Sequence, residues 1–151
     1  MFVTFAVTGG AILAGQHIAA AVLSAALGLV LVMVWQIGDR QFVRAGITLG
    51  QATGLDRIGT PSVFELPHTG GNYLTREMIY VVGRKHAQKL RLLAVILAGV
   101  FPPILLAIFH HGWPPIALAA ISHLVGAFAA RWLFFAEAEH VVGLYYGAHR
   151  G

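Results

Sequence analysis

Hydrophobic residues form long stretches along this chain, separated by one polar segment. No charged side chain precedes Asp39, and none lies between Arg91 and Arg131. A helix rises about 1.5 Å per residue and the hydrocarbon core of a bilayer is about 30 Å thick, so roughly 20 apolar residues can cross it. The pattern therefore predicts an all-α integral membrane bundle of three to four spans.

The opening apolar stretch is too long for one span, because its 38 residues would make a helix of roughly 57 Å. Breaks are offered by Gly9-Gly10 and by the residues around Gly15. We therefore expect a short first span over about 1–14 and a full second span over about 17–37. A signal peptide is the alternative, but the basic residues that normally precede its apolar region are missing.

The third span is expected over about 92–109, with Pro102 and Pro103 in its middle. Each proline lacks a backbone donor and crowds the carbonyl four residues earlier, so a kink is expected near Ala98 and Gly99.

The fourth span is expected over about 114–137. Trp113 suits the headgroup interface, and Pro114 and Pro115 fall in the first helical turn, where proline is tolerated. Only residues 110–112 connect it to the third span, so these two helices should be antiparallel.

Charge is concentrated in the polar connecting segment 39–91. Overall, 58% of residues are hydrophobic and 11% are charged, but this segment holds eight of the ten Lys/Arg and four of the six Asp/Glu residues, which is the whole net charge of +4. The positive-inside rule would place such a segment in the cytoplasm. Docking onto a protein subunit is the alternative role for so much basic surface.

Part of this segment has the pattern of an amphipathic interfacial helix running from Asn72, a suitable N-cap, to Arg91. Its basic face suits either anionic headgroups or a protein partner. Ahead of it, Gly46, Gly50 and Gly54 repeat every four residues, a weak signal for close helix packing.

Ionisable residues in or near the last span are candidates for function, because such groups are costly inside a membrane. Glu137 and His140 are three residues apart and share a helical face, where they can exchange a proton or bind a quinone carbonyl. Arg131, about two turns earlier, can hold a negative charge or pair with a glutamate. The quinone-binding candidates are therefore Arg131, Glu137 and His140.

Three other interpretations fit parts of the same pattern. In the first, Arg131, Glu137 and Glu139 only mark the membrane interface, within an aromatic belt. The second is a haem b electron carrier, for which His17 and His123 are the only histidines inside spans. The third is a small transporter, although no inverted repeat is recognisable.

Several linked motifs over residues 52–146 resemble the membrane anchor subunit of dimethyl sulfoxide reductase, a family to which the anchors of sulfite-oxidising complexes are similar. The blocks are Ala52-Thr53-Gly54-Leu55, Pro67-His68-Thr69, Asn72-Tyr73-Leu74, Glu77-Met78, Arg84-Lys85-His86-Ala87, Lys89-Leu90-Arg91, the block RWLFFAEAEHVV at 131–142, and Leu144-Tyr145-Tyr146.

The resemblance implies a non-catalytic subunit of the bacterial inner membrane. Such a subunit fastens an iron–sulfur subunit and a molybdopterin catalytic subunit to the membrane and exchanges electrons with the quinone pool. It implies no tightly bound cofactor, with quinone or quinol as an exchangeable ligand, and zero cysteines agree with the lack of a cluster here. The docking candidates are His68, Asn72, Arg76, Glu77, Arg84 and Lys85.

Members of that family have about eight spans in two halves, and this chain resembles only the second half. The resemblance therefore implies a fragment, or a site completed by a second half-anchor chain. The family's catalytic partners face the periplasm, which opposes the cytoplasmic placement that charge alone favours.

Overall fold

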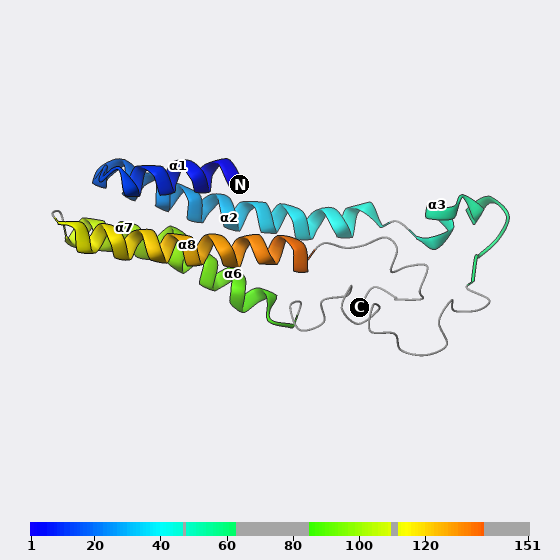
Figure 1. Ribbon diagram of the computed structural model, residues 1–151. Coiled ribbons are helices and arrows are strands. Elements are labelled where there is room, and N and C mark those ends of the chain that lie inside the picture. Colours follow the sequence, from blue (N-terminus) through cyan, green and yellow to red (C-terminus); the bar gives the residue numbers. More distant parts are fainter. Residues whose placement is uncertain (47, 63–84, 110–111, 138–151) are drawn as a thin grey trace.

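The computed structural model describes residues 1–46, 48–62, 85–109 and 112–137, in which every regular element is a helix and there is no strand (Figure 1). The predicted all-α fold is confirmed. The elements are α1 (Phe2–Leu13), α2 (His17–Ala45), α3 (Leu49–Thr53), η1 (Leu55–Arg57), α6 (Ala87–Val95), η2 (Ile96–Val100), α7 (Phe101–Ile108) and α8 (Trp113–Ala136).

Three helices are long and apolar enough to cross a membrane: His17–Gln41, Ala87–Ile108 and Trp113–Ala136. Large apolar side chains on them are exposed, such as Ile18 at 84% and Phe128 at 72%. Exposed apolar surface on this scale fits lipid-facing helices. The chain is therefore a multi-pass membrane protein.

α1 is too short to cross the hydrocarbon alone, since its 12 residues make about 18 Å of helix. It ends where Gly15 takes a φ of +67°, so this predicted break is confirmed. The break expected at Gly9-Gly10 is wrong, because both glycines lie inside α1. α1 packs along α2 and α8 (Figure 1).

α2 is longer than the expected span 17–37. It continues through Asp39 and Arg40 to Ala45, so the polar segment begins as helix. Asp39 is paired with a side chain from α6 (described below), which anchors this extension to the bundle.

The third span is one run of helix in which η2 is a π-helical turn between α6 and α7. Pro102 cannot donate to the Ala98 carbonyl, so the α-helical pattern is lost at the residues where the prolines predict a kink. A neighbouring helix contributes a donor here, because the Ser122 hydroxyl donates to the Leu97 carbonyl at 2.7 Å.

The helices meet through small residues. A Cβ placed on Gly99 would lie 2.6 Å from the Gly28 Cα, and one on Gly126 would lie 2.8 Å from the Ala98 Cβ. Close backbone approach of this kind is typical of helix packing in membranes. The predicted stripe has another role, since Gly46 and Gly54 take positive φ values in the connection around α3.

Both ends of the bundle are formed by several elements. The α1–α2 turn lies at the same end of the bundle as the end of α7 and the start of α8 (Figure 1). Gly15 approaches Ile116 there. The end of α2, the start of α6 and the end of α8 share the other. The predicted antiparallel arrangement of the last two spans is visible in Figure 1.

Candidate functional site

Arg91 joins three helices at the end of the bundle where the polar segment leaves the spans. Its Nη1 and Nη2 lie 2.6 and 2.8 Å from the two carboxylate oxygens of Asp39 on α2. Its Nε lies 2.9 Å from Oε1 of Glu137, the residue after α8. We call Asp39, Arg91 and Glu137 the arginine node.

The two carboxylates of the node differ in their environment. Asp39 is 54% exposed, whereas Glu137 is 20% and Arg91 15% exposed. Water can solvate the Asp39 carboxylate, but the negative charge of Glu137 is compensated mostly by the guanidinium. One cation faces two anions, so the node carries a formal charge of −1.

Trp35 covers the guanidinium from α2, with the Arg91 Cζ 5.6 Å from the ring centroid. Guanidinium groups bind favourably over aromatic faces, and the ring also limits water on that side. The node is therefore held by ion pairing and by packing.

Arg131 lies away from the node, so the expectation that it pairs with a glutamate is not met within the described residues. Six residues separate it from Glu137, which turns the helix by about 240° beyond a full turn and puts the two on different faces. Instead, its Cζ lies 4.6 Å from the Phe2 ring centroid and 5.0 Å from that of Phe135.

The rings around Arg131 form a small aromatic cluster that includes both α1 and α8. Phe2 and Phe134 meet edge to face at 5.7 Å between centroids, and Phe134 meets Phe135 at 5.4 Å. These three rings are between 41% and 54% exposed. A cation and aromatic faces are thus accessible together from the side of the bundle.

His123 is buried at 3% exposure between α8 and α1. Its Nε2 lies 3.0 Å from the Phe5 carbonyl, which can only accept, so Nε2 carries the proton. Gly9 allows this approach, because a Cβ there would lie 3.2 Å from Nε2. Nδ1 is buried without a partner in the described part of the chain.

His17 is the other histidine inside a span, and its Nδ1 is also buried without a partner among the described residues. Nε2 is the usual haem-ligating atom of a histidine, and in His123 it is hydrogen-bonded to the Phe5 carbonyl. In residues 1–46, 48–62, 85–109 and 112–137, no group of three or more His, Cys, Asp or Glu side chains is arranged to hold a metal ion.

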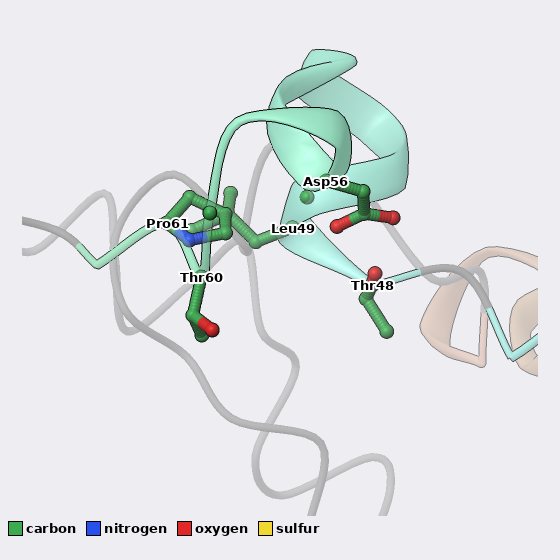
Figure 2. Close-up of a pocket in the computed structure, with 7 residues that line it drawn as sticks. Thr48, Leu49, Asp56, Thr60 and Pro61 are labelled. Atoms are coloured by element: carbon green, nitrogen blue, oxygen red, sulfur yellow. The ribbon is translucent and has the colours of Figure 1, made fainter.

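A hollow of about 450 Å³ lies in the polar segment around α3, lined by residues 48–50, 56 and 59–61 (Figure 2). Thr48 caps α3 with a capping box, accepting from the Gln51 N–H. A Cβ on Gly50 would overlap the Asp56 carboxylate, so glycine leaves room there for that side chain. With one carboxylate and two hydroxyls, the hollow has little chemistry of its own.

Most residues expected to dock a partner lie outside the described residues: His68, Asn72, Arg76, Glu77 and Arg84. The same holds for His140 and for most of the interfacial helix expected to run from Asn72 to Arg91. Lys85 is described and is exposed.

The node contains two residues that sequence reasoning did not select, Asp39 and Arg91. Their partners are 52 and 46 residues away, so no local pattern connects them. The available signal was position: Asp39 and Arg91 are the first and last charges bordering apolar stretches. No protein-family model matches the chain, and comparison with curated proteins and with solved structures gave no match.

Proposed function

We propose that this chain is a non-catalytic membrane anchor subunit of a molybdopterin oxidoreductase complex in a bacterial inner membrane. It fastens an iron–sulfur subunit to the bilayer and exchanges electrons with the quinone pool. The terminal reaction belongs to the molybdopterin subunit, in a complex related to dimethyl sulfoxide reductases or sulfite-oxidising enzymes.

The observation that carries this proposal is the contact between Arg91 and Glu137. Arg91 ends the block Lys89-Leu90-Arg91, and Glu137 lies in the block 131–142, two of the blocks that resemble the anchor family. They are 46 residues apart in sequence, yet their side chains are 2.9 Å apart at one end of the bundle. Separate parts of the resemblance thus meet in one polar site beside the membrane.

The chemistry of this end suits a quinone. Interconversion of a quinone and a quinol moves two electrons and two protons, and the electrons would pass to or from the iron–sulfur subunit. Glu137, partly buried beside a guanidinium, is a group that can pass a proton, with His140 as its expected neighbour. Arg131 lies on a different face of α8 and would contact a quinone separately from Glu137, donating to a quinone oxygen while the exposed rings of Phe2 and Phe135 pack on the quinone ring.

Recovery of the partners tests the anchor role. The tagged chain is extracted from its native membrane in mild detergent and captured. We expect an iron–sulfur protein and a molybdopterin protein to be recovered with it, and fewer of both when Arg76 and Arg84 are changed to glutamine. Capture of the chain without either protein would contradict the proposal.

The quinone site is tested in the assembled complex. We expect Glu137→Gln and His140→Ala to slow quinone turnover by about 10²-fold or more, the usual contribution of a positioned proton-transfer group. Asp39→Asn is the matched control, because it weakens the other pair of Arg91 without touching Glu137. Unchanged turnover in an assembled complex would remove Glu137 and His140 from the site.

A further inference from the structure

The described charges are all at one end of the bundle. Apart from the node and Arg131, which lies within α8 against aromatic rings, the cations nearest the spans are Arg40 and Arg44 on α2 and Lys85 and Lys89 at the start of the third span, and all four are exposed. We call these four residues the basic collar. At the other end, residues 13–19 and 105–109 carry no charged side chain.

The level of the collar follows from helix length. α2 begins with His17 and α7 ends with Ile108, at the same end of the bundle (Figure 1). Arg40 is 23 residues from His17, about 35 Å along the helix, and Lys89 is 19 residues from Ile108, about 28 Å. With about 30 Å of hydrocarbon, both fall at the headgroup layer. Arg44 and Lys85 lie one turn farther out, within reach of it.

The acidic side chains of the node, which lie at the level of the collar, are paired with Arg91. Asp39 is held by two hydrogen bonds from Arg91, and Glu137 by the Nε of the same residue. Both carboxylates of the node are therefore paired with Arg91. The four cations of the collar are exposed and leave their positive charge on the surface. Arg40 follows Asp39 directly, and Lys89 is two residues before Arg91, so the collar flanks the node on two adjacent helices.

We infer that the basic collar binds the headgroups of anionic phospholipids, and so fixes this end of the bundle in an anionic leaflet. Basic side chains beside spans are attracted to such a leaflet, by about fivefold in binding per residue. Lys85, which the sequence also suggested for subunit docking, is assigned here to lipid, because it lies only one turn beyond Lys89. This inference does not depend on the proposed electron-transfer role.

The test measures which lipids surround Trp35, which lies against the node. The chain has three tryptophans, so Trp113→Phe and Trp132→Phe leave Trp35 as the single reporter. The full chain is reconstituted in vesicles containing brominated phosphatidylglycerol, which quenches tryptophan, mixed with ordinary phosphatidylcholine, and in vesicles with the bromine label exchanged. The ratio of quenching gives the relative affinity for the two lipids.

We expect phosphatidylglycerol to be preferred by about fivefold or more, and less so at high salt, because exposed charges are screened. Arg40→Gln with Arg44→Gln, and Lys85→Gln with Lys89→Gln, should each lower the preference, and the four changes together should bring it close to one. Arg57→Gln is the matched control: it removes an exposed cation from η1, which follows α3 beyond the end of α2.

Three results would overturn the inference: equal affinity for the two lipids in the unsubstituted chain, a preference that persists without the four cations, or an equal loss in Arg57→Gln. Equal affinity would favour an acidic protein as the partner of the collar. Circular dichroism of each variant shows whether it folds, and the two double variants allow a decision if the fourfold variant does not.

Discussion

Arg91 compensates two carboxylates at once, and its side chain is mostly buried. The pair with Asp39 has the better geometry, because both carboxylate oxygens are bonded, yet Asp39 is half exposed and water can replace part of that bonding. Glu137 is less exposed than Asp39 and is paired with only one nitrogen of the guanidinium, Nε. Loss of the cation therefore costs more than loss of either acid.

We expect Arg91→Met to lower the free energy of unfolding by about 2–3 kcal/mol, since it leaves a partly buried carboxylate without its partner. Arg40→Met is the control, because it removes a neighbouring cation that is exposed and should cost about 0.5 kcal/mol or less. Unfolding by a denaturing detergent, followed by circular dichroism in mild micelles, measures both. Equal losses would mean that the node contributes little to stability.

The charged residues of the candidate site could be predicted only in part from the sequence. Glu137 and Arg131 were selected because ionisable groups next to an apolar helix are rare, and this is a local property. Arg91 ends the expected interfacial helix, and its own neighbours are basic, so no local feature distinguishes it. Its real partners come from helices distant in sequence, and such pairing depends on the register between helices, which a single sequence does not encode in any local pattern.

Elements were easier to predict than contacts. The prolines located the disturbance of the third span, because the missing N–H groups act within one turn of their own position. The end of α2 was missed by about eight residues, since hydropathy marks where a helix leaves hydrocarbon and does not mark where the helix ends. Glycine spacing suggested a packing stripe at Gly46, whereas the close contacts involve isolated glycines on different helices.

The crossing of α2 with η2 depends on one such pair. A methyl group added by Gly99→Ala would meet the Gly28 backbone at 2.6 Å, so the helices must separate and lose packing that membrane helices need for association. We expect a loss of about 1–3 kcal/mol in detergent unfolding. Gly38→Ala is the control on α2, because its methyl group would meet nothing within 4 Å. A similar loss in both variants would contradict the close crossing.

At the scale of the whole molecule, the three long helices and α1 form a bundle with a charged end and an uncharged end. The number of spans followed from the apolar stretches, because hydrocarbon thickness sets their length. The pairing of Arg91 with Asp39 and Glu137 at one end of the bundle could not be predicted from the apolar stretches. Both ion pairs depend on how the spans pack together, which their individual hydrophobicity does not determine.

This arrangement predicts that the connection around α3 and the connection between α7 and α8 lie on opposite sides of the membrane. The chain contains no cysteine, so single cysteines can be introduced at Ile58 and Phe109, which are 84% and 53% exposed. In intact cells, a membrane-impermeant maleimide should label one variant, and the other only after the membrane is opened. Labelling of both in intact cells would contradict the crossing of an odd number of spans between them.

The side on which Ile58→Cys is labelled also distinguishes two causes of orientation: cytoplasmic placement follows if basic residues decide the orientation, and periplasmic placement follows if partner docking decides it.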